Sequence, residues 1–219
     1  MFLILIIFLF QKNINILLAG DYEIFLKESN LNYLVKLLKK ADKENSPRII
    51  SNKDGTKSII YQRNNFQKEL NYDQLKHLLN NPRRFSKEQK FIKNSIKFLN
   101  EVGLSVILSE FKNQKGSATW IPNKKIIKIN KEIIKAGSLT FAQVLNHEMI
   151  HTAQSCKAGS LTSYPELIGL SEKMSDEKNS LLSSAIYKNL SKYEISLEKE
   201  AYSHQEDLSV GKYLINRFC

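Results

Sequence analysis

Apolar residues recur at helical spacing along several segments of this 219-residue chain. Over residues 22–44, leucine and valine return at intervals that place them on one face of a helix. The same periodicity predicts a helix that begins at Ser86 and stops at Gly103, with phenylalanine, isoleucine and leucine on its apolar face. Further helices are predicted over residues 69–81, 176–190 and 192–216.

A strong helical pattern begins at Thr140 and runs to about Cys156. Thr140 and Gln143 fit a capping box, in which a side-chain oxygen and a Gln side chain three residues later each bond the other's backbone N–H. Ser86 and Gln89 repeat this arrangement in the helix predicted before it. Both helices are therefore expected to begin at their capping residue.

Strands are predicted where short apolar runs flank turn residues. Residues 48–61 indicate one hairpin, and residues 117–129 indicate a second one around a turn at 122–125. A single strand is predicted over residues 104–110. We therefore expect an α+β fold, with a small mixed sheet or hairpin packed on the Thr140 helix and helices elsewhere.

The composition is that of a globular protein, with 42% hydrophobic and 25% charged residues. Lysine and arginine number 33 against 22 aspartate and glutamate, which gives a formal net charge of +11. The lysines are spread along the chain, without the interleaved aromatic residues or the arginine-rich face typical of nucleic-acid readers. We therefore expect no nucleic-acid partner. A basic nucleic-acid-associated protein, in which the histidine and glutamate pattern at residues 147–151 is accidental, stays open as a less favoured alternative.

The first twenty residues are almost entirely apolar and end in Ala19 and Gly20, before the acidic Asp21. This segment fits a signal peptide with a small-residue cleavage site, although Lys12 interrupts its apolar run. The protein is therefore expected to be exported, periplasmic or secreted, with no transmembrane span beyond this N-terminal signal or anchor. The alternative is a buried N-terminal strand or helix.

Export bears on the two cysteines of the chain, Cys156 and Cys219. In an oxidising compartment they could pair and tie the C-terminus to the middle of the chain, whereas in the cytosol both would be free thiols. Their spacing does not match the C-x-x-C pattern of redox or metal motifs. A disulfide is therefore the interpretation that goes with export.

The Thr140 helix contains an H-E-x-x-H motif, formed by His147, Glu148 and His151. An α-helix turns by about 100° per residue, so side chains four positions apart lie nearly one above the other. The two imidazoles can therefore bind one ion, and Zn²⁺ suits imidazole nitrogen. Glu148 projects beside them, where a carboxylate can accept the proton of a metal-activated water.

A catalytic zinc usually takes three protein ligands and keeps one position for water or substrate. The third ligand must come from farther along the chain, and the predicted C-terminal helix offers several candidates. These are Glu198, Glu200, His204, Glu206 and Asp207. Glu198 and Glu200 would point to different faces of a helix, so only one of them is expected to bind the metal.

The motif and its downstream glutamates resemble those of gluzincin-type zinc metallopeptidases, over roughly residues 104–210. In that group, H-E-x-x-H is followed by a helix whose ligand glutamate often lies in an E-x-x-A setting. Glu198 to Ala201 matches that setting. The resemblance therefore implies that Glu198 is the third zinc ligand, with Glu200 as the runner-up. It also implies that the edge strand at 117–121 aligns the substrate backbone.

The sequence departs from related patterns at two places. Tyr202 stands where the common E-x-x-A-D form has aspartate. Residues 152–157 contain no histidine, although metzincins and SprT-like proteases need a third histidine shortly after the second. Those families are therefore disfavoured.

The resemblance implies a zinc-dependent peptidase that hydrolyses peptide bonds of a peptide or protein substrate, with Glu148 as the general base. His204, Tyr202 and Tyr164 are candidates for stabilising the oxyanion. Gln154 lies near the ligand face of the helix and could bond a ligand or substrate. A catalytically inactive zincin-like protein that binds only a metal or a partner remains the alternative, and the retained Glu148 argues against it.

The domain organisation follows from these assignments. Residues 1–20 are the possible signal peptide, residues 21–103 form an N-terminal helical and hairpin region of unknown role, and residues 104–219 form the zincin-like core.

Overall fold

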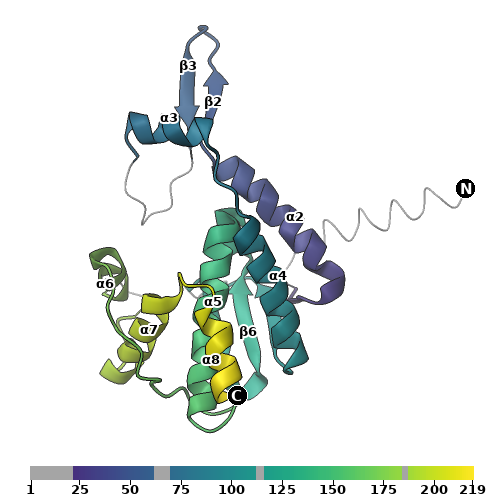
Figure 1. The fold of residues 1–219 in the computed structure, drawn as a ribbon, viewed down its shortest axis with the longest axis vertical. Helices are drawn as coiled ribbons and strands as arrows, with labels where there is room; N and C mark the ends of the chain where they lie inside the picture. The colour runs from purple at the N-terminus through teal and green to yellow at the C-terminus, as the bar shows by residue number, and fades with distance from the viewer. Residues whose placement is uncertain (1–21, 62–69, 112–115, 184–186) are drawn as a thin grey trace, which may run out of the picture.

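The computed structural model describes residues 22–61, 70–111, 116–183 and 187–219, and the predicted signal segment lies outside them. It has a mixed α+β fold with a predominance of helix, as expected (Figure 1). The strands are β1 (Ile24–Phe25), β2 (Arg48–Ser51), β3 (Lys57–Ile60), β4 (Ser105–Ser109), β5 (Ala118–Ile121) and β6 (Ile126–Asn130). The α-helices are α2 (Glu28–Asn45), α3 (Tyr72–Asn80), α4 (Ser86–Glu101), α5 (Gly137–Lys157), α6 (Asp176–Leu182), α7 (Lys192–His204) and α8 (Val210–Phe218). Two 3₁₀ helices, η1 (Pro122–Lys124) and η2 (Lys131–Ala136), flank β6.

The larger sheet has four strands in the order β1-β4-β6-β5. β4 runs parallel to β6, whereas β1 and β5 are antiparallel to the strands beside them. The predicted second hairpin is confirmed, and Trp120 of β5 pairs with Ile127 of β6. Within the described sheet β5 is an edge strand, so one side of its backbone faces away from the other strands.

Helices from both halves of the chain pack on this sheet and share one core. Its fully buried members include Leu34, Leu38, Ile92, Ile96, Val106, Ile127, Phe141 and Leu145. Helix α5 lies at the centre of the fold and is buried along almost its whole length after the first turn (Figure 1). The helix that carries the motif is therefore held rigidly by α2 and α4 as well as by the sheet.

Helix α5 begins at Gly137, about one turn before Thr140, so the capping box predicted at Thr140 is wrong. Its first turn is capped from another helix, because the Asp42 carboxylate accepts bonds from the Ser138 N–H at 2.7 Å and from Ser138 Oγ at 2.6 Å. Gly137 has a φ of +88°, and a Cβ there would lie 2.5 Å from Asp42 Oδ1. Glycine allows both this backbone conformation and this close approach.

Helix α4 begins at Ser86 as predicted, but no capping box forms there. Phe85 is its N-cap residue, and no side chain caps the helix. The Gln89 side chain instead donates to Asp42 Oδ2 at 3.2 Å and to Ser138 Oγ at 3.3 Å. The capping box predicted for Ser86 and Gln89 is wrong, because the Gln89 side-chain amide bonds these distant residues and not the start of its own helix.

The continuous helix predicted over residues 192–216 is wrong, since a turn at 205–209 separates α7 from α8. The buried Asn146 side chain of α5 stabilises this turn. Its amide nitrogen donates to three carbonyl oxygens of the turn, those of His204, Gln205 and Asp207, at 3.4, 3.0 and 2.9 Å.

The helix predicted over 176–190 is also too long, because α6 ends at Leu182. In the N-terminal segment, β1 precedes the helix expected from residue 22.

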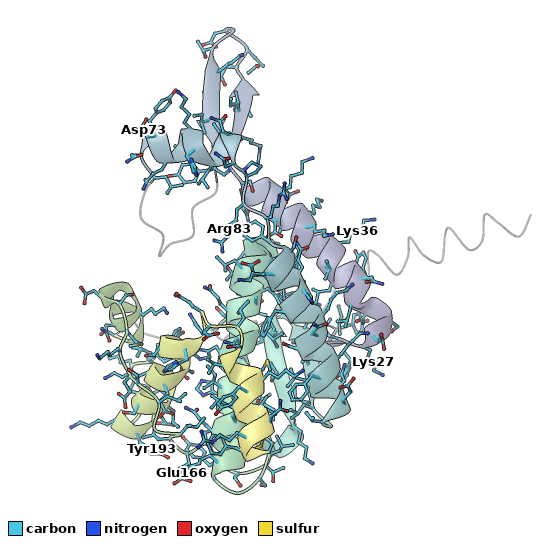
Figure 2. All side chains as sticks on the ribbon, in the orientation of Figure 1. Lys27, Lys36, Asp73, Arg83, Glu166 and Tyr193 are labelled. Carbon is cyan, nitrogen blue, oxygen red and sulfur yellow. A yellow bond between two sulfur atoms is a disulfide. The ribbon has the colours of Figure 1, made fainter. Side chains whose placement is uncertain are left out.

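The β2–β3 hairpin, predicted from the sequence, projects with α3 away from the rest of the fold (Figure 1). Helix α3 buries none of its residues, and Asp73 on it lies far from Glu166 and Tyr193 at the other end of the molecule (Figure 2). No helix among the described residues is both long and apolar enough to cross a membrane.

A disulfide joins Cys156, near the end of α5, to Cys219 after α8. The sequence separation is 63 residues, and the bond fastens the last helix to the motif helix. Helix α8 also contributes Leu214 and Ile215 to the common core. The C-terminal helix is therefore held by both a covalent bond and apolar packing.

Candidate metal centre

His147 and His151 lie one turn apart on α5, and Glu198 of α7 faces both of them. The two Nε2 atoms are 3.0 Å apart. Glu198 Oε2 lies 3.2 Å from His147 Nε2, and Glu198 Oε1 lies 3.4 Å from His151 Nε2. One ligand atom from each of the three residues lies within 4.8 Å of the others, so the group can hold a metal ion.

The outer nitrogens of the two imidazoles face amide oxygens. His151 Nδ1 lies 2.7 Å from Gln154 Oε1, and His147 Nδ1 lies 3.2 Å from Gln205 Oε1. An amide oxygen only accepts hydrogen bonds, so each Nδ1 carries a proton, and Nε2 is the nitrogen directed toward the shared point. Two imidazole nitrogens and a carboxylate therefore converge there, which is an arrangement that a metal cation fits.

The electrostatics of the group also favour positive charge at this point. Burial alone would lower the pKa of His151, but the charge and hydrogen bond of Glu198, followed by the charge of Glu148, raise it to about 9. Burial alone would raise the pKa of Glu198, but His151 and His147 hold it well below its ordinary range. Either a proton or a metal ion can supply the cation that these carboxylates require.

Glu148 lies next to the group without being part of it, and its side chain is buried. Burial raises the pKa of this carboxyl, while the charges of His147 and His151 oppose the rise. The Trp120 backbone N–H also bonds Glu148 and opposes the rise. The edge strand β5 and the motif glutamate are therefore in direct contact.

A cleft of about 760 Å³ opens onto these residues. Its walls come from β5, from the first half of α5, from the loop before α6 and from α7. The lining includes Trp120, Leu139, Val144, Tyr164, Pro165, Tyr187, Leu190 and Leu197, together with His147, Glu148, His151 and Glu198. The group of His147, His151 and Glu198 therefore lies in a partly apolar cleft that is open to solvent.

The oxyanion candidates lie in different places. Tyr202 lines the cleft, and its ring packs edge-on against His147 with centroids 4.5 Å apart. Tyr164 also lines the cleft, but its side chain is largely exposed and donates to Glu194 at 3.0 Å. His204 is not among the cleft residues, and its Nε2 lies 3.1 Å from the Ser171 carbonyl oxygen. Of these three, Tyr202 is nearest to the metal-binding group.

Glu200, the alternative third ligand, points away from the histidines and into the protein. Its carboxylate accepts bonds from the backbone N–H groups of Ile168, Gly169 and Leu170 at 3.0, 2.6 and 2.7 Å. It also accepts a bond from Gln154 Nε2 at 3.0 Å, and the residue is 1% exposed. These four donors satisfy the hydrogen-bonding capacity of the Glu200 carboxylate. Glu198 is the glutamate that lies beside His147 and His151.

Two residues of the site, Gln205 and Tyr187, are not predictable from the sequence pattern. Gln205 contacts the outer nitrogen of His147, and it belongs to a turn that the sequence pattern placed inside a helix. Tyr187 OH lies 2.6 Å from Tyr202 OH and lines the cleft. Neither residue belongs to a recognisable motif, because each reaches the site through the fold of the C-terminal segment.

No protein-family model, no curated protein and no solved structure matches the chain. The functional assignment therefore depends on the geometry of the site.

Proposed function

We propose that this protein is a zinc-dependent metallopeptidase of the gluzincin type. One observation carries the proposal: the buried carboxylate of Glu148 lies beside the group of His147, His151 and Glu198, within a cleft open to solvent. A purely structural metal site has no need of an additional carboxylate at this position. Zincin-like topology is part of the same proposal, since an edge strand and two helices surround the site.

The donor set fits zinc better than calcium or magnesium. Two imidazole nitrogens and one carboxylate are the ligand types of many catalytic zinc sites, and they leave one position open. Calcium and magnesium prefer sets made of oxygen alone. A zinc ion held by these residues would supply the Lewis acidity that activates a water and polarises a peptide carbonyl.

Glu148 is the proposed proton carrier of the reaction. Its raised pKa, due mainly to burial, suits a carboxylate that accepts a proton from the attacking water and passes it to the leaving amine. The Trp120 backbone N–H bonds this carboxylate, and Glu148 lines the cleft. General acid–base catalysis of this kind contributes rate factors of about 10² to 10⁴.

Tyr202 is the proposed donor to the developing oxyanion. Burial raises the pKa of Tyr202 to about 12, so its hydroxyl stays protonated and able to donate at neutral pH. The Tyr187 hydroxyl oxygen lies 2.6 Å from the Tyr202 hydroxyl oxygen and fixes the orientation of the Tyr202 hydroxyl. A fixed neutral donor beside the metal-binding group is the arrangement that oxyanion stabilisation requires.

The proposed substrate is a peptide segment in an extended conformation. Strand β5 lies at the edge of the described sheet and lines the cleft, so its backbone can pair with an added strand. Leu139 and Val144 supply an apolar wall for side chains of the substrate, whereas the Trp120 side chain is buried in the core and its indole N–H donates to Ser155 at 2.8 Å.

Export is part of the proposal. The Cys156–Cys219 disulfide supports an oxidising compartment, because such bonds persist mainly in exported proteins. The apolar character of the first twenty residues supports the same location.

The test begins with metal content. Residues 21–219 are purified without chelator or histidine tag, and zinc is measured by elemental mass spectrometry for the wild type and for His147→Ala. We expect about one zinc per wild-type chain and a loss of most of it in the variant. Absence of zinc from the reconstituted wild type would overturn the metal assignment.

Activity is measured next on a mixture of unstructured peptides, with cleavage products identified by mass spectrometry. Glu148→Gln is expected to keep the zinc and to cleave about 10² to 10⁴ times more slowly than the wild type. Glu101→Gln, an exposed position on α4, is the matched control and is expected to retain wild-type activity. A wild type that holds zinc but cleaves nothing would favour the inactive zincin-like alternative.

A further inference from the structure

A chain of buried hydrogen bonds leads from His151 away from the cleft. Gln154 is fully buried, and its Oε1 lies 2.7 Å from His151 Nδ1. Its Nε2 donates to the Leu197 carbonyl oxygen at 3.2 Å and to Glu200 Oε2 at 3.0 Å. Because both of these partners only accept, the amide cannot be reversed, and its oxygen must face His151.

The Glu200 carboxylate continues this chain into the loop before α6. Three successive backbone N–H groups, those of Ile168, Gly169 and Leu170, bond it from the loop. A buried carboxylate needs such donors, since leaving one uncompensated in the interior is costly. The conformation of the loop at 168–170 and the position of the Glu200 side chain therefore depend on each other.

The same loop forms part of the cleft wall. Tyr164 and Pro165 line the cleft, and the next residue, Glu166, donates its backbone N–H to the Gln154 carbonyl oxygen at 3.0 Å. Figure 2 shows Glu166 beside Tyr193, whose hydroxyl lies 3.5 Å from the Pro165 carbonyl oxygen. Gln154 thus holds the loop twice, once through its own backbone and once through Glu200.

We propose that Gln154 and Glu200 are positioning residues that couple the metal site to the cleft wall at residues 164–170. Gln154 fixes the ring of His151 and the nitrogen that carries its proton. Glu200 fixes Gln154 and the loop together. Order in the loop therefore strengthens metal binding, and a bound metal orders the loop by the same factor, because such coupling is reciprocal. This inference rests on the metal assignment of the proposed function, but it does not depend on peptide hydrolysis.

The first test uses the wild-type protein and zinc alone. Hydrogen–deuterium exchange is measured by mass spectrometry with and without zinc. We expect zinc to slow exchange over residues 164–170 by about fivefold or more, the lower range of typical coupling between sites. Zinc binding that leaves this exchange unchanged would overturn the inference alone, whereas absence of zinc binding would overturn the proposed function together with it.

The second test compares zinc affinities by competition with a chromophoric chelator. Gln154→Leu keeps the approximate volume but removes the bonds, and it is expected to weaken zinc binding about 10- to 100-fold, as loss of an outer-shell partner does. Gln89→Leu is the matched control, because it removes a glutamine that bonds Asp42 and Ser138 far from the metal group. It is expected to lower thermal stability while leaving zinc affinity within about threefold, inside the range of a mutation that is not coupled to the site.

A further variant covers the case in which Gln154→Leu does not fold. Glu200→Gln is nearly isosteric and keeps one carbonyl oxygen as an acceptor, so we expect it to fold, to bind zinc more weakly and to lose the zinc-dependent protection of residues 164–170. Wild-type zinc affinity in both Glu200→Gln and a folded Gln154→Leu would overturn the inference.

Discussion

The main-chain nitrogen of Gly211 lies 3.1 Å from Oδ1 of Asn146, the residue immediately before His147. This contact brings the start of α8 against α5 with no room for a side chain. A Cβ at position 211 would lie 2.5 Å from Asn146 Oδ1 and 2.8 Å from Met149 Cβ. Glycine at this position is therefore a packing requirement, in a helix that also carries the cysteine-linked C-terminus.

Gly211→Ala is expected to destabilise the protein by about 1–3 kcal/mol, the usual cost of overpacking a tight contact. The clash would be with a backbone-bonded asparagine and a buried side chain, neither of which can move freely. Urea unfolding measures the effect. Gly116→Ala is the control, since its Cβ would meet its nearest neighbour at an ordinary 3.5 Å. Equal stability of the two variants would contradict a tight contact of Gly211 with Asn146 and Met149.

Asn146→Asp tests the turn between α7 and α8. The substitution keeps the shape of the side chain but replaces a nitrogen that donates to three carbonyl oxygens with an acceptor. Because the site is fully buried, we expect a loss of about 3 kcal/mol or more of unfolding free energy. Asn189→Asp, at an exposed position, is expected to change stability by less than about 0.5 kcal/mol. A small effect at position 146 would show that the turn does not depend on this amide.

The sequence was informative where the signal is local. Residues His147 and His151 share a helix face because four positions make one turn, and the hairpin of β5 and β6 follows from apolar runs around Pro122. Spacing alone also indicated that Glu198 and Glu200 face different ways. Helix period and turn chemistry are properties of neighbouring residues, so no tertiary information is needed to read them.

The sequence was uninformative where a distant polar side chain decides the outcome. Asp42 caps α5 from another helix, although Thr140 and Gln143 look like a local capping box. The Asn146 side chain of α5 bonds the turn between α7 and α8, and this turn presents Gln205 to His147. These partners are separated by 58 or more residues, and no local pattern records such bonds.

Asp42→Ala tests the cap supplied from a distance. Its removal leaves the Ser138 N–H and hydroxyl without their acceptor, so we expect a loss of about 1–2 kcal/mol, as for loss of a good N-cap. Thermal unfolding of the metal-free protein measures the effect without a contribution from zinc. Asp73→Ala, on the projecting helix α3, is the control and should change stability by less than about 0.5 kcal/mol. If the Asp42 variant proves no less stable than the Asp73 variant, the cap makes no contribution.

Cys219→Ser tests the bond that fastens α8. A disulfide that closes a loop of 63 residues is expected to stabilise the protein by about 2–4 kcal/mol, mainly by restricting the unfolded chain. Urea unfolding of the wild type should therefore become sensitive to reductant, and unfolding of the variant should not. Helix α8 keeps its core contacts through Leu214 and Ile215, so the variant is expected to fold. A wild type that unfolds identically with and without reductant would contradict the stabilising role.

Glu198 and Glu200 lie only two positions apart, but they have different partners. Glu198 faces the imidazole nitrogens at 3.2 and 3.4 Å, whereas Glu200 is bonded by loop N–H groups and by Gln154. Glu198→Gln is expected to weaken zinc binding by more than about 100-fold, since even outer-shell losses cost about 10- to 100-fold. It should also lower the unfolding free energy of the metal-free protein, because the charge that pairs with the imidazoles of His147 and His151 is removed. Glu200→Gln should cost about 1–3 kcal/mol in metal-free stability through its loop and Gln154 bonds, with a smaller loss of zinc affinity than Glu198→Gln. Zinc titration and urea unfolding of both variants measure the two quantities side by side. A larger loss of affinity in Glu200→Gln than in Glu198→Gln would reverse the assignment of the third ligand.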